Sequence, residues 1–204
     1  MKQLYPDLWQ TTPEHPFGDR TSARAYLLTR PDGNVLFCGT RGTDEDIEQI
    51  ASLGGIARQY LTHRHEIGPG LTVLKKRFGQ TIYCHKHDAS APVDTEFEER
   101  EVHLGNVELI PTPGHTPGST CFFVSSPTGC KYLFTGDSIF PQGDGWGTYV
   151  SRFQRSTLAN SLQLLRTLPV DVVLPSASRS ERTVREMSPG EWAAIIDDVI
   201  HTLG

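Results

Sequence analysis

Three strand-like apolar runs in this chain each end in a short block that contains histidine or aspartate. The runs and their blocks are 57–62 before Thr62-His63-Arg64-His65, 106–111 before Thr112-Pro113-Gly114-His115, and 131–135 before Thr135-Gly136-Asp137. A strand that leads into a polar turn places the side chains of that turn at a sheet edge, where functional groups gather. The pattern therefore favours a sheet-containing fold whose loops assemble a site.

The other periodic segments predict two sheets flanked by helices. Strand-like runs at 25–30 and 34–38 enclose Asp32-Gly33, which suits a tight hairpin turn. Further strands are predicted at 80–84, 119–124 and 171–174, and helices after Thr43, around 71–78, at 158–165 and at 191–200. Because there are too few helices for every strand to have a crossover, we expect largely antiparallel or mixed sheets with helices outside.

The last helix carries the clearest start signal in the chain. Ser188-Pro189-Gly190-Glu191 combines a predicted N-cap, a proline at the first helical position and a capping-box glutamate. Apolar residues then follow at helical spacing from Trp192 to Ile200. This pattern predicts an amphipathic helix that begins after Ser188 and buries one face.

Composition restricts the class of protein. A chain of 204 residues with no composition break predicts one domain, 1–204. The net charge of −5 supplies no general attraction to nucleic acid or anionic lipid, and no apolar run reaches bilayer length or forms a signal peptide at the start, so we expect a cytoplasmic protein. The four cysteines lack metal-binding spacing and are predicted to be reduced and structural. Oligomeric state is not specified.

The histidines and the aspartate have the chemistry of metal ligands. His63 and His65 are two residues apart after a strand, so both rings can face one ion, although such a pair is also common among ordinary loop residues. Two prolines and two glycines hold His115 on a stiff bend. Asp137 follows a strand, where it serves either as a ligand or as a turn carboxylate.

Taken in order, these blocks resemble the metallo-β-lactamase superfamily over essentially the whole chain. The most specific pieces are Pro111–Ser119 and Phe134–Asp137, which are similar to the third and fourth metal-binding blocks of that family. The resemblance implies an α+β fold, a four-layer αββα sandwich of two mixed sheets. It also implies that His63, His65 and His115 hold one metal ion, with Asp137 as catalytic residue and as fourth ligand or former bridge to a second ion.

The sequence departs from the hydrolases of this family at three positions. Their first block reads His-x-His-x-Asp-His, whereas here Ile67 stands at the Asp position and Gly68 at the next His. Ala177 stands at the position of a late histidine. These residues belong to one metal site, so the resemblance implies a single remaining ion. Zinc is the default, although iron or manganese would accept the same donors.

Three functions are compatible with a degenerate second site. The first is a metal-dependent hydrolase-like protein with a mononuclear site, acting on a small-molecule ester or thioester. The second is an inactive scaffold, with or without a metal ion, that binds a ligand or another protein. The third, by resemblance to persulfide dioxygenases, is a mononuclear iron enzyme. Metal content and metal identity separate the three.

Further polar residues have weaker signals. Glu66 neighbours the lost Asp position and is expected to be exposed to solvent, with only a small case for it as a substitute base. His85 and His87 are expected to be structural or surface residues. Three arginines, Arg179, Arg182 and Arg185, are expected on a solvated face, with substrate-anion binding as the alternative. The glycine-rich stretch 143–147 is predicted to form a pocket wall.

Overall fold

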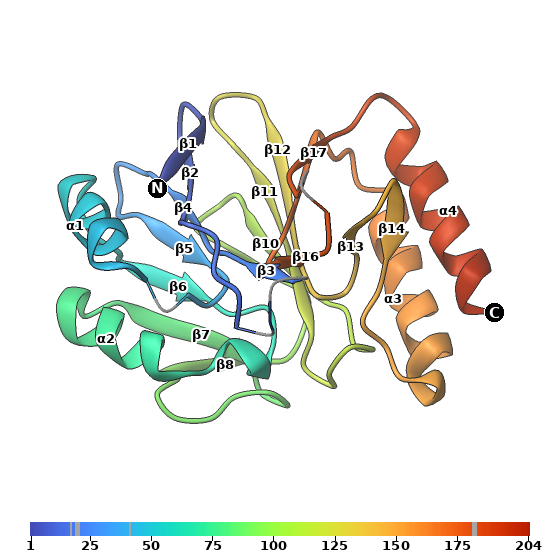
Figure 1. Ribbon diagram of the computed structural model, residues 1–204, viewed down its shortest axis with the longest axis horizontal. Coiled ribbons are helices and arrows are strands. Elements are labelled where there is room, and N and C mark those ends of the chain that lie inside the picture. The colour runs from blue at the N-terminus through green and yellow to red at the C-terminus, as the bar shows by residue number, and fades with distance from the viewer. Residues whose placement is uncertain (17, 19–20, 41, 181–182) are drawn as a thin grey trace.

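In the computed structural model, two β-sheets pack face to face between two pairs of helices, as Figure 1 shows. The structure describes residues 1–16, 18, 21–40, 42–180 and 183–204. One sheet has seven strands in the order β1 (Lys2–Tyr5), β2 (Leu8–Gln10), β4 (Tyr26–Leu28), β5 (Val35–Phe37), β6 (Arg58–Tyr60), β7 (Thr81–His85) and β8 (Thr95–Phe97). The other has six: β17 (Arg185–Glu186), β15 (Val172–Pro175), β12 (Lys131–Gly136), β11 (Thr120–Ser125), β10 (Val107–Pro111) and β9 (Glu101–His103).

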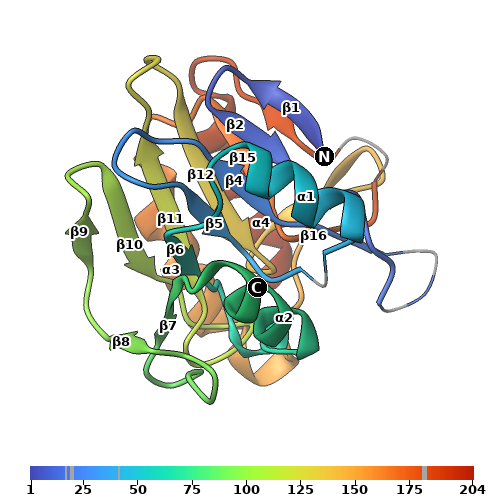
Figure 2. The same cartoon turned by 90° about the vertical axis from the view of Figure 1, so that its left-hand side faces the viewer.

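The outer layers are helical. Helices α1 (Asp44–Ser52) and α2 (Pro69–Phe78) lie on the side of the seven-stranded sheet, and α3 (Arg155–Arg166) and α4 (Glu191–Leu203) lie on the side of the six-stranded sheet (Figures 1 and 2). Two short pairs, β13 (Phe140–Gln142) with β14 (Gly145–Gly147) and β3 (Ser22–Ala23) with β16 (Ala177–Ser178), complete the described strands. The predicted αββα sandwich is confirmed.

Both sheets are mixed, as predicted. In the seven-stranded sheet, β1, β2, β4 and β5 pair antiparallel, and β5 to β8 pair parallel. Helices α1 and α2 supply the crossovers from β5 to β6 and from β6 to β7, because parallel neighbours need a long connection. In the six-stranded sheet only β12 and β15 run parallel.

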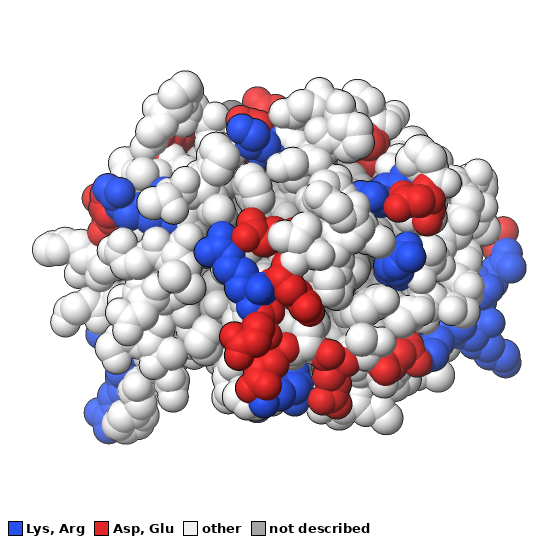
Figure 3. Space-filling model, turned by 180° about the vertical axis from the view of Figure 1, so that it is seen from behind, with Lys and Arg blue, Asp and Glu red and all other residues white. Residues whose placement is uncertain are grey.

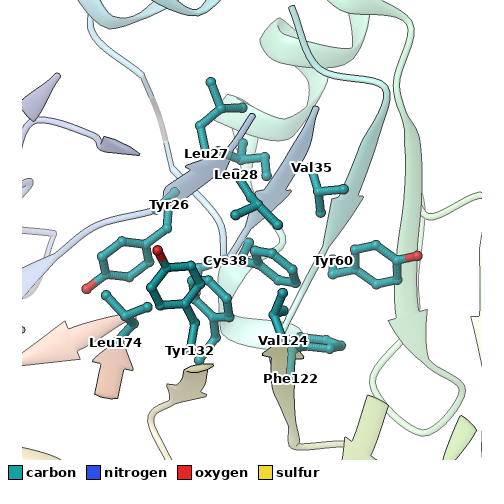
Figure 4. Packing of buried hydrophobic residues seen from close by; sticks show 14 of the residues in the cluster. Tyr26, Leu27, Leu28, Val35, Cys38, Tyr60, Phe122, Val124, Tyr132 and Leu174 are labelled. Carbon is teal, nitrogen blue, oxygen red and sulfur yellow. The ribbon is translucent and has the colours of Figure 1, made fainter. Parts of the chain in front are cut away.

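Alternation along the central strands builds two separate cores. Phe122 and Phe134 face the space between the sheets, where Phe134 stacks on Phe37 with ring centroids 4.0 Å apart. Their chain neighbours Phe123 and Leu133 point the other way and pack with α3 and α4. Figure 4 shows the inter-sheet core, to which both sheets contribute aromatic and aliphatic side chains.

The end of the chain corrects one sequence prediction. Helix α4 begins at Glu191 rather than directly after Ser188, because Gly190 is left-handed, with φ 82°, and cannot belong to the helix. The Ser188–Glu191 contact exists nevertheless: the backbone N–H and the hydroxyl of Ser188 both donate to the Glu191 carboxylate. The capping partners were thus predicted correctly and the boundary was not.

The surface and the cysteines agree with the sequence expectations where the structure bears on them. All four cysteines are free. Acidic and basic side chains are interspersed on the face shown in Figure 3, where acidic groups form a band near the lower centre. Among the helices in the described part of the chain, none combines the length and apolar character needed to cross a bilayer.

Replacing Phe134 by alanine should destabilise the sandwich. The side chain is fully buried and stacks across both sheets, so its loss leaves a cavity and should lower the free energy of unfolding by about 3–5 kcal/mol. Denaturant unfolding measures the change. Phe153→Ala is the matched control, because that ring is 77% exposed and its loss should cost less than about 0.5 kcal/mol. Equal losses of unfolding free energy in the two variants would contradict the packing of Phe134 between the sheets.

Candidate metal site

The three predicted ligand blocks meet at one edge of the sandwich. Strand β6 leads into a 3-10 turn, Arg64–Glu66, that carries the first histidines, while β10 and β12 of the opposite sheet lead to His115 and Asp137. The backbone N–H of Thr120 donates to the carbonyl of Thr62 at 2.8 Å and so joins the two sheets at this edge. The ends of strands from different sheets are thereby brought to one place.

The ring nitrogens of His63, His65 and His115 converge. One nitrogen from each ring lies within 4.8 Å of the other two, and the distance from His65 Nδ1 to His115 Nε2 is 3.0 Å. Asp137 Oδ2 lies 3.6 Å from His63 Nε2 and 3.6 Å from His115 Nε2. Three imidazoles and one carboxylate oxygen therefore surround a common point, which is the donor set that a tetrahedral divalent ion prefers.

Two hydrogen bonds orient the donors. His115 Nδ1 lies 2.7 Å from the carbonyl oxygen of Tyr149, which can only accept, so Nδ1 carries the proton and Nε2 keeps its lone pair for the cluster. The hydroxyl of Ser176 donates to Asp137 Oδ1 at 3.0 Å. Only Oδ2 of this carboxylate then faces the rings, which fits one ion better than a bridge between two.

The surroundings of two of the imidazoles keep them in the neutral form that binds metals. Desolvation lowers the pKa of His63 to about 4, although the nearby Asp137 carboxylate opposes the shift. Desolvation and the neighbouring His115 ring also lower the pKa of His65. Both rings are therefore neutral at pH 7 and compete little with protons for a metal ion.

Asp88 ties the first ligand loop to the third. Its Oδ2 accepts from the backbone N–H of Arg64 at 3.1 Å and from the hydroxyl of Thr116. Gly118 packs directly against this carboxyl group, since a Cβ at that position would lie 2.7 Å from Asp88 Cβ and Cγ. The second glycine of the Pro-Gly-His-Thr-Pro-Gly block is therefore required by close packing.

A second close approach lies beneath the ligands. Gly136 is left-handed, with φ 55°, and a Cβ there would collide with the Thr62 side chain. The glycine before Asp137 thus lets β12 turn against the end of β6. The positions of His63 and Asp137 depend on this contact between the two sheets.

A cavity of about 310 Å³ opens beside the cluster. Its lining includes the three positions at which the sequence departs from the family hydrolases, Ile67, Gly68 and Ala177, together with Glu66 and Asp137. The space next to the histidine cluster therefore lacks the three side chains that the resemblance assigns to a second metal.

Several weaker predictions are corrected here. The side chain of Glu66 is only 7% exposed, so the expectation of solvent exposure was wrong. It was wrong because the 3-10 turn, which the sequence did not predict, directs the side chain inward to the backbone N–H and hydroxyl of Thr62. The stretch 143–147 is absent from the described cavity lining; it forms a hairpin whose Trp146 packs on Trp192 of α4.

The remaining polar candidates lie apart from the cluster. The Nε2 atom of His85 lies 3.2 Å from the carbonyl of Glu98, and His87 is exposed, in agreement with structural or surface roles. The guanidinium of Arg179 lies over Tyr149 and that of Arg185 over Trp146. Arg182 lies outside the described residues.

Several groups around the site were not predicted from the sequence. Three residues position the ligands or their loops through hydrogen bonds: Thr62, Asp88 and Ser176. In the sequence they are ordinary loop or strand-end residues. The cavity is completed by residues of the N-terminal segment, among them Glu14 and Ala23. The one sequence signal for Thr62, Asp88 and Ser176 is their position, as polar side chains at or shortly after the ends of strands.

Comparison with known proteins agrees with this geometry. The family model of the metallo-beta-lactamase superfamily matches residues 46–177, which is more than half of the chain. The chain belongs to the metallo-β-lactamase superfamily. It is 26% identical over 203 residues to the probable metallo-hydrolase YqgX of Bacillus subtilis, covering 86% of this chain and 92% of that protein.

Shorter matches link the chain to hydroxyacylglutathione hydrolases. The protein of that name from Salmonella arizonae is 35% identical over 127 residues, which cover 58% of this chain and 46% of the relative. A second one, from Rhizobium meliloti, is 33% identical, and the match covers 50% of this chain and 39% of the relative. The chain thus spans less than half the length of these relatives.

Solved structures share the fold. A metallo-beta-lactamase from Pontibacter korlensis superposes with a TM-score of 0.69 at 15% identity, covering 99% of this chain and 97% of that one. ETHE1 from Myxococcus xanthus superposes with a TM-score of 0.65 at 22% identity, covering 92% and 91%. At these identities the likeness establishes the fold alone.

Replacing Glu66 by glutamine should change how stability depends on pH. Desolvation raises the pKa of Glu66 from near 4.5 to about 7, so the folded protein holds this proton over a range in which the unfolded chain has lost it. The parent protein therefore loses stability as pH rises from about 4.5 to 7, and the glutamine variant does not. The variant should gain on the order of 2 kcal/mol relative to the parent between pH 5 and pH 8.

Urea unfolding of chelator-treated protein at pH 5, 6.5 and 8 measures this difference. Glu45→Gln serves as the control, because Glu45 is exposed on α1 and its replacement should give the same difference at every pH. Parallel stability curves for the parent and Glu66→Gln would show that the carboxyl is not perturbed by burial.

Proposed function

We propose that the chain is a metal-dependent hydrolase with a mononuclear site, held by His63, His65, His115 and Asp137 within one domain, 1–204. The observation that carries the proposal is the convergence of three ring nitrogens within 4.8 Å of one another, with a carboxylate oxygen beside them. Three ring nitrogens and a carboxylate oxygen held this close direct their lone pairs at one another, which is unfavourable and which a bound cation offsets.

The donor set defines which metals fit. Three nitrogens and one oxygen suit zinc, which we take as the default ion, and iron or manganese accept the same donors. An ion with an open coordination position lowers the pKa of water and polarises a carbonyl group. The cavity beside the cluster gives a small substrate access to that position.

The protein's own groups would complete the reaction. Asp137 would hold the ion through Oδ2 and accept the proton of an attacking water through the carboxylate oxygen that the ion leaves free. Ile67 supplies neither function. We propose that Asp137 takes over proton handling, and that hydrolysis is slower than in family members with the full first block.

An ester or thioester is the substrate class that the comparisons favour. The named relatives include hydroxyacylglutathione hydrolases and a probable metallo-hydrolase at 26–35% identity. The cavity of about 310 Å³ accommodates a small molecule rather than a polymer segment.

Metal content tests the site directly. Protein prepared without chelator or a metal-binding tag should retain about one equivalent of a divalent metal, as measured by elemental analysis, because the described residues form one such cluster of donors. His63→Ala and His115→Ala should lose most of it. His87→Ala is the matched control, since that histidine is exposed outside the cluster. Full metal retention in the two cluster variants would refute the assignment.

Activity provides the second test. The metal-loaded protein should hydrolyse one or more members of a panel of esters and thioesters, and Asp137→Asn should lower kcat by about 10²-fold or more by removing the proton-accepting carboxylate. The exposed Asp144→Asn is the control and should keep the parent rate. Stoichiometric metal without turnover of any panel member would favour a binding protein or an oxygen-activating enzyme.

Restoring the missing side chains tests the proposed loss of the second ion. The triple variant Ile67→Asp, Gly68→His, Ala177→His should bind about two equivalents of zinc, because these positions line the cavity next to Asp137. Gly68 has extended backbone and nothing within 4 Å of an added Cβ, so a histidine meets no obstacle there. A stoichiometry that stays at one would contradict the proposed location of the second site.

A further inference from the structure

The buried carboxylate of Glu66 faces the loop that carries the first ligand. Its Oε2 accepts from the backbone N–H of Thr62 at 2.9 Å, and its Oε1 accepts from the hydroxyl of Thr62 at 2.5 Å. A direct contact with His63 is absent at hydrogen-bond distance, since Oε1 and Nδ1 are 3.6 Å apart. Thr62 therefore stands between the carboxylate and the imidazole.

The hydroxyl of Thr62 has one proton, and its direction decides the state of the ring. Because that proton is donated to Glu66 Oε1, the oxygen can only accept from its other neighbour, His63 Nδ1, at 2.9 Å. The proton on the ring must then lie on Nδ1. On the other side of the ring, Nε2 is 3.6 Å from Asp137 Oδ2, which is too long for a hydrogen bond.

We infer that Glu66 and Thr62 form a relay that holds His63 in the Nδ1–H tautomer and leaves its Nε2 lone pair free for the metal ion. The inference rests on the proposed metal site and makes both residues positioning residues rather than catalytic ones. Both carboxylate oxygens of Glu66 are engaged with Thr62, which separates this role from that of a free base in the cavity.

The arrangement is matched on the opposite sheet. The carbonyl of Tyr149 fixes the tautomer of His115, so a backbone acceptor does there what the Thr62 hydroxyl does for His63. The hydroxyl proton of Thr62 can rotate, so Glu66 is needed to set its direction. A backbone carbonyl only accepts and needs no such partner. The relay thus gives the buried Glu66 carboxylate a role at the metal site.

Two measurements test the relay. Long-range proton–nitrogen NMR correlations on metal-free protein at pH 8 report the tautomer, with the His63 signals assigned by their absence in His63→Gln. Competition with a chelator at pH 8 reports zinc affinity. In the parent protein His63 should be protonated at Nδ1. In Thr62→Val the Nε2–H tautomer should appear, and zinc affinity should fall by about 10–100-fold.

Conservative variants separate orientation from packing. Thr62→Ser keeps the hydroxyl and should bind zinc as tightly as the parent. Glu66→Gln keeps one oxygen acceptor but places an amide N–H₂ against the Thr62 backbone or hydroxyl donor, so its loss of affinity should lie between those of Thr62→Ser and Thr62→Val. The exposed Glu45→Gln is the control for removing one negative charge. Circular dichroism establishes that each variant is folded.

An Nε2–H tautomer of His63 in the parent, or equal zinc affinity for Thr62→Val and Thr62→Ser, would overturn the relay. If Thr62→Val does not fold, the relay is tested by the His63 tautomer of the parent protein and by the zinc affinity of Glu66→Gln. Failure of the metal site itself has a different signature: zinc would be retained in His63→Ala and His115→Ala, while the tautomer measurement on metal-free protein would still report on Thr62 and Glu66.

Discussion

The packing of the two sheets through their aromatic inner faces determines where every group of the site lies. Phe37 of one sheet and Phe134 of the other stack at 4.0 Å; β5, which bears Phe37, lies next to β6, and β12, which bears Phe134, leads directly to Asp137. A shift of one sheet against the other would separate His63, which follows β6, from Asp137, which follows β12. The metal site is therefore a property of the sandwich rather than of either sheet.

Contacts at the sheet edge convert that packing into ligand geometry. Gly136 allows the end of β12 to approach Thr62, and Asp88 joins the first and third ligand loops. The hydrogen bond that His115 donates to the Tyr149 carbonyl and the one that Asp137 accepts from Ser176 then leave one nitrogen and one oxygen directed at the cluster.

Much of this could be predicted from the sequence because strand periodicity and the spacing of histidines are local. The hairpin at 25–38, the helices and the order of ligand blocks followed from pattern and resemblance, and the structure places the ligands together. The short strands β1 and β2 were not predicted, because two strands of 3 and 4 residues carry little periodic signal. Their existence depends on tertiary pairing, of β2 with β4 and of β1 with β2.

The environment of Glu66 could not be predicted for a similar reason. Its orientation depends on a 3-10 turn of 3 residues and on the hydroxyl of Thr62, and neither has a sequence signature. The same holds for Ser176, whose role appears only when β15 is laid beside β12. Tertiary contacts, rather than propensity, decide which polar side chains of such loops turn inward.

X-ray absorption spectroscopy at the metal edge tests the central claim most directly, because it counts the atoms around the ion. For zinc-loaded protein we predict one ion per chain with three imidazole nitrogens at about 2.0–2.1 Å and at least one oxygen at a similar distance. A metal–metal vector at about 3.5–4 Å, or fewer than three imidazoles, would contradict a mononuclear site held by His63, His65, His115 and Asp137.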